Sequence, residues 1–378
     1  MSDYTTPGQF IADLLHHRGW SKRALAVVLE KDESTINKII AGKSAVTTET
    51  ALALEDVFSV PAEQFLELQR KYDLAVARIA NKPDRSRASR ATLFGDLPIA
   101  AMGKRGWIKT EDFQDLNAVE AELRGFFAAE TTGEIDILLP HAARKTQVNA
   151  DPTPAQLAWL YRVKAIASEL MVPRYSQAAL ERALPKLHAL MTAPEEVRHT
   201  PRILADCGVR FVIVESLPSA KIDGVCFWLD DQSPVIGLSL RHDRIDNFWF
   251  VLRHECEHVL LGHGRAAMVL DTELEGAKAG QGLDIPEEER LANKAAQDFC
   301  VPSAKMDAFI ARKAPFFSER DLTGFAKILG VHPGVVAGQL QHRTGRYERF
   351  RQYLANIRVH LGTGVAIDGW GDVYPLGE

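Results

Sequence analysis

The stretch Phe250–Gly264, FVLRHECEHVLLGHG, places two histidines four residues apart, with a glutamate directly after the first. Apolar residues surround them at helical spacing, and Gly262 is a natural stop for a helix. Residues four apart share one face of a helix, so His254 and His258 can direct two imidazoles at one metal ion. Glu255 lies about 100° around the helix from His254, at the edge of that face. The pattern predicts a zinc centre in which Glu255 is the general base.

A catalytic zinc ion needs a third protein ligand and an open position. A second predicted helix, PEEERLANKAAQDFCVP at 286–302, offers Glu289 and Asn293 at the same four-residue spacing. Glu289 is the favoured ligand, and Asn293 is expected to hold a ligand histidine by a hydrogen bond. One Zn²⁺ per chain is expected, with Mn²⁺ as the alternative metal. The rival ligands are His263, Glu273, Glu275, Glu287 and Glu288. The competing interpretation is an ordinary helix that binds no metal.

Composition sets limits on the class of protein. The chain has 378 residues, 46% hydrophobic and 25% charged, which is typical of a globular protein with two or three domains. The net charge of -5 means that any nucleic-acid binding must rest on a local face. The four cysteines form no CxxC pair, and no export signal or long apolar run is visible. We therefore expect a cytoplasmic protein with no membrane span.

Three predicted strands precede the metal motif, at 208–216, 221–232 and 233–240, where β-branched and aromatic runs are broken by Pro and Gly. Strands followed by this helix would let an extended substrate add to a sheet edge beside the metal. Further helical patterns lie at 112–130, 153–171, 176–191, 318–331 and 333–345, and the tail looks irregular. The predicted fold class is α+β: an all-α bundle, then a mainly helical body with a small β-sheet.

The amino-terminal part predicts five short helices with turn signals between them. Pro7 opens the first and Gly19 ends it; Ser21 caps the second; the third runs from about Glu33 to Gly42. A fourth follows Thr47, and Pro61 opens the fifth. The expected domains are a helical bundle at 1–80, a basic linker at 81–110, a helical connecting region at 111–200, a peptidase-like domain at 201–310 and a helical annex with tail at 311–378.

Two resemblances sharpen these expectations. Residues 208–302 resemble the ImmA/IrrE metallopeptidases in four ordered blocks: KIDGVCFWL, VIGLSL, RHDRIDNFWFVLRHECEHVLLGHG and the E-x-x-A-N-x-A-A block that ends at Val301 and Pro302. The resemblance implies a zincin-like domain with zinc bound by His254, His258 and Glu289, and with Glu255 as the base. Leu291 stands where a second acid is frequent in the family.

Residues 7–78 resemble the helix-turn-helix domain of the XRE type, closest to HigA-like antitoxins, although Glu30-Lys31-Asp32 stands in a turn where Gly is usual. The resemblance implies that the third helix enters the major groove of a double-stranded DNA operator, and that the protein is a homodimer on a palindromic site. Thr35 and Asn37 can read base edges, whereas lysines suit phosphates. The expected DNA-contacting residues are Lys22, Glu33, Ser34, Thr35, Asn37, Lys38 and Lys43. A protein-interaction module is the alternative for this bundle.

These features predict a DNA-binding zinc metallo-endopeptidase that regulates transcription. Its expected substrate is a helix-turn-helix repressor, an antitoxin-like partner or the chain itself. The alternative is a HigA-like antitoxin and autorepressor whose peptidase-like domain is a sensor or toxin-binding platform without turnover. A third possibility is an adaptor that binds no DNA and docks a protein substrate on its helical bundle.

Overall fold

The computed structural model describes residues 6–80, 97–110, 112–130, 143–145, 152–265, 268–272, 286–362 and 365–376. The chain forms two compact units, Met1–Arg87 and Ala88–Glu378, which are described separately. Within the described ranges, no helix is both long enough and apolar enough to cross a bilayer.

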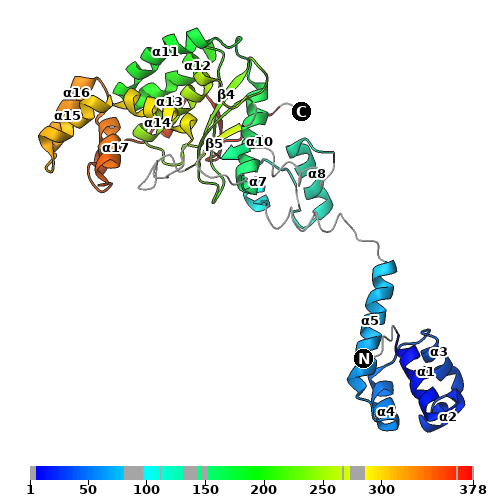
Figure 1. Ribbon diagram of the computed structural model, residues 1–378. Helices are drawn as coiled ribbons and strands as arrows, with labels where there is room; N and C mark the ends of the chain where they lie inside the picture. Colours follow the sequence, from blue (N-terminus) through cyan, green and yellow to red (C-terminus); the bar gives the residue numbers. More distant parts are fainter. Residues whose placement is uncertain are drawn as a thin grey trace. The chain divides into compact units, whose positions relative to one another are not determined.

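The amino-terminal unit is a bundle of five helices: α1 (Pro7–Arg18), α2 (Lys22–Val28), α3 (Glu33–Ile40), α4 (Thr48–Phe58) and α5 (Ala62–Ala80) (Figure 1). Local signals set the helix ends, as predicted. Ser21 and Thr47 accept hydrogen bonds from backbone N–H groups in the first turns of α2 and α4. Gly19 ends α1 in the left-handed conformation, at φ 65°. Apolar side chains such as Ile11, Leu25 and Ile36 form the core.

The turn between α2 and α3 departs from the usual residue choice. Glu30 adopts φ 53°, a left-handed conformation that glycine enters without the steric cost of a Cβ atom. The backbone N–H groups of Glu30 and Lys31 bond back to the carbonyls of Val27 and Ala26, so the turn keeps its hydrogen bonds. The glutamate is accommodated, but in a strained backbone conformation.

The second unit is built on a six-stranded mixed sheet with the order β1-β5-β3-β4-β2-β6. The strands are β1 (Ala143–Lys145), β2 (Arg210–Val214), β3 (Ile222–Trp228), β4 (Pro234–Leu238), β5 (Met268–Thr272) and β6 (Ala366–Asp368). β3 runs antiparallel to β4 and β5, whereas β2 is parallel to β4 and β6, and β1 is parallel to β5. All three predicted strands are present, as β2, β3 and β4. The strands β1, β5 and β6 were not predicted.

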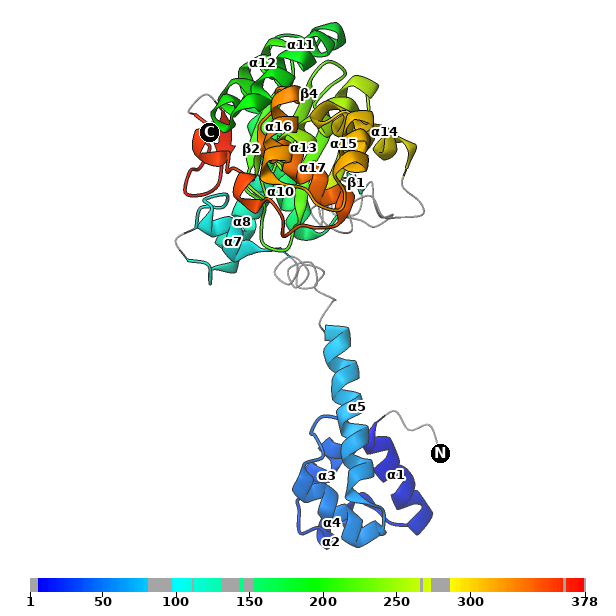
Figure 2. The same ribbon diagram turned by 90° about the vertical axis from the view of Figure 1, so that its left-hand side faces the viewer.

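Helices cover both faces of this sheet. Successive residues of a strand point to opposite faces, so Phe211 and Ile213 belong to one core and Val212 and Val214 to the other. The first core packs against α11 (Gln177–Ala189), α12 (Thr200–Asp206), α13 (Ile245–Leu261), α14 (Glu287–Cys300), α15 (Ser303–Lys313), α16 (Glu319–Leu329) and α17 (Pro333–Thr344). The second packs against α7 (Ile99–Lys104), α8 (Leu116–Phe127) and α10 (Pro154–Glu169). Figure 1 shows the sheet between these two groups of helices, and Figure 2 looks onto the first group, with α16 and α17 in front of the sheet. Short 3₁₀ turns lie at Leu190–Thr192, Pro194–His199, Arg351–Tyr353 and Arg358–His360.

The predicted linker at 81–110 is folded at its carboxyl end, because it contains the helix α7. Residues 81–96 lie outside the described ranges, but α7 follows, and Met102, Trp107 and Ile108 are buried in the second unit. The helix was not predicted because it has only six residues and follows a segment rich in Arg, Lys, Gly and Pro that has no sustained helical period. Likewise, α16 and α17 share the core of α13 and do not form a separate annex.

The tail was predicted to be irregular, and this was wrong for β6. β6 pairs with β2, and Asp368 at its end is fully buried beside Arg162 of α10. Asp368 also accepts hydrogen bonds from Trp107 Nε1 at 2.6 Å and from the backbone N–H of Tyr374 at 3.0 Å. A single buried carboxylate therefore joins three separate stretches of the chain.

Candidate metal centre and helix-turn-helix surface

Helix α13 carries the two histidines of the opening motif on one face, as their spacing predicted. The helix begins at Ile245, after Arg244, so Asp246 lies within its first turn. Gly262 ends it at φ 73°, and its N–H bonds back to the carbonyls of His258 and Val259. The apolar residues around the motif pack on the sheet, which leaves both imidazoles inside the protein.

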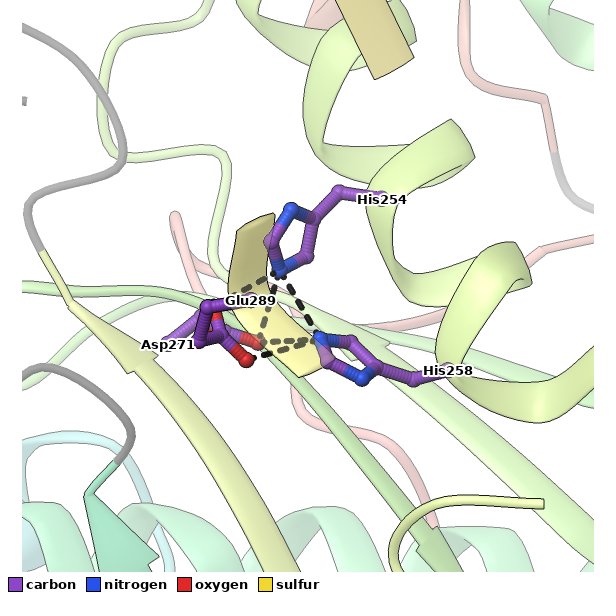
Figure 3. Close-up of side chains that lie close together, drawn as sticks. All are labelled: His254, His258, Asp271 and Glu289. Carbon is purple, nitrogen blue, oxygen red and sulfur yellow. Dashed lines mark hydrogen bonds and ion pairs between the residues drawn. The ribbon is translucent and has the colours of Figure 1, made fainter. Parts of the chain in front are cut away.

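Two carboxylates face these imidazoles: Asp271 on β5 and Glu289 in the first turn of α14 (Figure 3). The Nε2 atoms of His254 and His258 are 3.0 Å apart. Glu289 oxygens lie 3.4 Å and 3.1 Å from these two nitrogens, and Asp271 Oδ2 lies 3.4 Å and 3.9 Å from them. All four side chains are fully buried. The structure thus brings Glu289 to the predicted place and adds Asp271, which sequence reasoning missed.

This cluster fits a zinc ion by its chemistry and its spacing. Imidazole nitrogens and carboxylate oxygens are both ordinary zinc ligands. At zinc bond lengths of about 2.0 to 2.1 Å, tetrahedral donors lie about 3.3 Å apart. The four donor atoms here lie within 4.8 Å of one another. Neither Glu289 oxygen accepts a hydrogen bond of normal geometry from a described residue, and a buried carboxylate is costly without a compensating cation.

The carboxyl of Glu255 lies beside the cluster, against β3. Its side chain is fully buried, and a Cβ atom built on Gly224 would lie 2.1 Å from its Oε1 atom. Only glycine at that point of the strand leaves room for the carboxyl group. Burial raises the pKa of Glu255 well above its ordinary value, and the neighbouring Asp271 raises it further. A carboxyl group in this environment is suited to accept and return a proton.

The imidazole of His254 experiences opposing effects. Burial lowers its pKa, but the carboxylates of Asp271 and Glu289 outweigh burial and raise the pKa to about 10. The positive charge favoured at this point is the one that a metal ion would also supply.

The prediction for Asn293 receives no support. Within the described residues no hydrogen bond joins its side chain to either imidazole, and the Nδ1 atom of His254 has no partner. The second nitrogen of His258 instead lies 2.9 Å from Nδ1 of His263. The backbone carbonyl of His263 accepts a hydrogen bond from Trp228 Nε1 at 2.8 Å, which fixes the residue. His263, considered as a rival metal ligand, is thus a support for His258.

The remaining rivals do not enter the cluster. Glu287 and Glu288 are exposed at the start of α14, and Glu273 and Glu275 lie outside the described residues. Cys256 is buried and is not part of the cluster, and burial raises the pKa of its thiol to about 12, which makes the thiol unreactive. Asp271 follows the apolar run Met268–Leu270, and that run was the signal available for an additional strand leading to a ligand.

The predicted DNA-contacting residues lie on the surface of the amino-terminal unit. Thr35 is half-buried, and the others are exposed: Lys22, Glu33, Ser34, Asn37, Lys38 and Lys43. Ile36 and Ile39 point into the core, so α3 presents its polar face outward. Within the described part of the chain, none of the three lysines has an ion-pair partner, whereas Lys31 lies 3.6 Å from Glu49. This surface combines side chains able to read base edges with cations able to contact phosphates.

Comparison with known proteins concerns this unit. A helix-turn-helix family model matches residues 11–65. The uncharacterized HTH-type transcriptional regulator YddM of Escherichia coli K12 is 32% identical over 77 residues, which are 20% of this chain and 82% of that protein. The chain belongs to the helix-turn-helix family. Virulence-associated protein I of Dichelobacter nodosus is 36% identical over 72 residues, 19% of this chain and 67% of that protein.

Two solved structures also match a part of this helix-turn-helix protein. The Pseudomonas aeruginosa antitoxin HigA with the higBA promoter is 30% identical, with a TM-score of 0.20, and the match covers 20% of this chain and 84% of that one. An addiction module antidote protein of the HigA family from Coxiella burnetii is 28% identical, with a TM-score of 0.19, covering 21% and 87%. The family assignment rests on the sequence matches.

Proposed function

We propose that this helix-turn-helix protein is a transcriptional regulator with a zinc-dependent endopeptidase centre in its second unit. The observation that carries the proposal is the buried cluster of His254, His258, Asp271 and Glu289, with the Glu255 carboxyl beside it. Buried charged groups are rare unless they are paired or bind metal. The substrate class proposed is a peptide bond in a repressor, in an antitoxin-like partner or in the chain itself.

Each residue of the proposed centre would have a separate role in hydrolysis. His254, His258 and Glu289 would hold one zinc ion. A zinc ion in such a site acts as a Lewis acid for the scissile carbonyl and lowers the pKa of a water molecule. Glu255 would take the proton of the attacking water and return it to the leaving amine, and Gly224 leaves the space that its carboxyl needs. His263 would orient His258 through the contact between their Nδ1 atoms.

Metal content tests the centre directly. Purified wild type, Glu289→Ala and the control Glu288→Ala would be compared by inductively coupled plasma mass spectrometry after zinc loading and desalting. We expect about one zinc per chain in the wild type and in Glu288→Ala, because Glu288 is exposed and outside the cluster. Glu289→Ala should lose most of it. Equal zinc content in all three proteins would overturn the assignment of Glu289.

Hydrolysis is tested by Glu255→Gln, which keeps the shape of the side chain but cannot accept the proton. We expect cleavage of a helix-turn-helix partner protein to fall at least about 100-fold, with zinc content and DNA binding retained. Cleavage at the wild-type rate by the variant would contradict the role of Glu255.

The amino-terminal unit is proposed to bind a double-stranded DNA operator as a homodimer, through the exposed face of α3. We expect Asn37→Ala to lower the affinity for the operator by about 1–3 kcal/mol and to relax its sequence preference. Lys38→Ala should weaken binding to all sequences and reduce the dependence on salt. Arg320→Ala, an exposed cation on α16 of the second unit, is the control. Equal affinities for all four proteins in a gel-shift titration would exclude this face.

A second candidate function is a HigA-like antitoxin and autorepressor without turnover. The observation in its favour is that every donor of the cluster is fully buried, as in a structural metal site. It predicts neutralisation of a toxin partner and operator binding that both survive Glu255→Gln, with no cleavage product at any time. An adaptor that binds no DNA would instead fail to shift DNA at any salt concentration.

A further inference from the structure

Asp271 takes a position that a hydrolytic zinc centre would have to leave open. Its Oδ2 atom lies 3.4 Å and 3.9 Å from the two imidazole nitrogens, close to the separation expected for donors around one ion. With His254, His258 and Glu289 holding a metal ion, Asp271 would be a fourth protein ligand. Structural zinc sites are closed by four protein ligands, whereas catalytic sites have three and keep one position for water or substrate. The described conformation therefore matches a closed site.

The sheet is shaped so that Asp271 reaches the cluster. Asp271 pairs with Gly224 of β3, and the register between β3 and β5 shifts between Ile222 and Gly224. Such an irregularity is a common device for re-aiming a side chain next to a functional site. Gly224 is also the residue against which the Glu255 carboxyl packs. Asp271 is thus held next to both the metal ligands and the proposed base, where the attacking water and the scissile carbonyl have to bind.

The chain also covers the outer side of the strand that carries Asp271. β1 (Ala143–Lys145) pairs in parallel with β5, so β5 is not at the edge of the sheet. The sequence predicted that an extended substrate would add to a sheet edge beside the metal. In the described conformation this position beside β5 is occupied by the protein's own strand, only three residues long. Short strands contribute few ladder hydrogen bonds, so this pairing is a weak one.

We propose that Asp271 is a displaceable fourth ligand, which closes the metal centre in a resting state and has to withdraw before a substrate can bind. The inference rests on the proposed zinc centre and adds its regulation. A ligand that binds only the open form has an apparent dissociation constant equal to the intrinsic constant divided by the open fraction. For an open fraction of about 0.1 to 10%, opening the site permanently should tighten binding about 10- to 1000-fold.

The test uses the full chain loaded with Co²⁺, whose visible absorption reports its ligands, and acetohydroxamate as a small metal-binding probe. The proteins are wild type, Asp271→Ala, Asp271→Asn and the control Glu288→Ala, each checked for folding by circular dichroism. We expect one cobalt per chain in all four. Acetohydroxamate should bind Asp271→Ala at least about 10-fold more tightly than wild type and change its spectrum at lower concentration. Asp271→Asn should lie between them, and Glu288→Ala should match wild type.

Two results would overturn the inference while leaving the proposed function in place. Equal probe affinity in wild type and Asp271→Ala would mean that Asp271 does not close the site. Loss of cobalt from folded Asp271→Ala, to the level of Glu289→Ala, would make Asp271 a permanent ligand. A different result, a folded wild type that binds neither cobalt nor zinc, would remove the proposed centre itself, so the two failures are distinguishable.

Discussion

Replacing Asp368 with Asn should unfold the second unit at a markedly lower temperature. Asp368 is fully buried and pairs with Arg162, which is itself only 4% exposed. The variant leaves the guanidinium of Arg162 buried without an anion, which typically costs about 3–5 kcal/mol. It also turns an amide N–H₂ toward groups that are themselves donors, such as Trp107 Nε1. For Ala88–Glu378, an unfolding entropy of about 2.1 cal/mol/K per residue converts this loss into a fall of about 5–8 °C in the unfolding temperature.

Calorimetry on the full chain is the assay, since it can separate the unfolding of the second unit from that of the amino-terminal bundle. Asp372→Asn, an exposed carboxylate nearby in the tail, is the matched control and should change nothing. The double variant Arg162→Met with Asp368→Asn removes both charges, so it should be more stable than Asp368→Asn alone. If the double variant loses as much stability as Arg162→Met and Asp368→Asn lose together, the reasoning is refuted. An unpaired buried charge would then not be the cause of the loss in Asp368→Asn.

Three further predictions concern the centre and the bundle. Gly224→Ala should displace the Glu255 carboxyl by ~1 Å and lower the rate of hydrolysis by about 100-fold, with zinc retained. The control is Gly324→Ala, where an added Cβ meets nothing within 4 Å. An unchanged rate of hydrolysis in Gly224→Ala would contradict the packing argument. Glu30→Gly should stabilise the amino-terminal bundle by about 0.5 to 1 kcal/mol, measured by calorimetry, because the φ of 53° at this position costs glycine less than glutamate. A less stable variant would argue against strain at that turn. In the proposed zinc centre, zinc would displace the proton of His254, whose pKa is raised to about 10. The affinity for zinc should therefore increase with pH across the neutral range, by up to about tenfold per pH unit for each proton released. A zinc affinity that does not change with pH would contradict His254 as a ligand.

What the sequence predicted well depends on local interactions. Caps and stops such as Ser21, Thr47 and Gly19 act within one helical turn, so the five amino-terminal helices could be placed from the sequence. The spacing of His254 and His258 likewise fixes their common face once a helix forms. Glu289 lies on a separate helix, and it was found because its own four-residue spacing and the family resemblance pointed to it.

What the sequence did not predict depends on pairing between distant segments. Asp271 joins the cluster only because β5 pairs with β3 in a shifted register, and no local pattern specifies a register. β6 has three residues and gains its stability from β2 and from the bond between Asp368 and Arg162. The hydrogen bond expected from Asn293 is not seen among the described residues, because spacing on a helix does not determine which neighbour a side chain contacts.

Contacts in the second unit join residues that are far apart in the sequence, and this affects the order in which the two units fold. Arg162 and Asp368 are 206 positions apart, whereas the amino-terminal bundle is closed by helices that follow one another within residues 7–80. Folding slows as contacts become more distant along the chain, and the amino-terminal part leaves the ribosome first. The helix-turn-helix surface should therefore be complete while the sheet that supports the metal centre is still forming. Each new molecule would pass through an interval in which the helix-turn-helix unit is folded but the cluster of the proposed metal centre is not yet assembled.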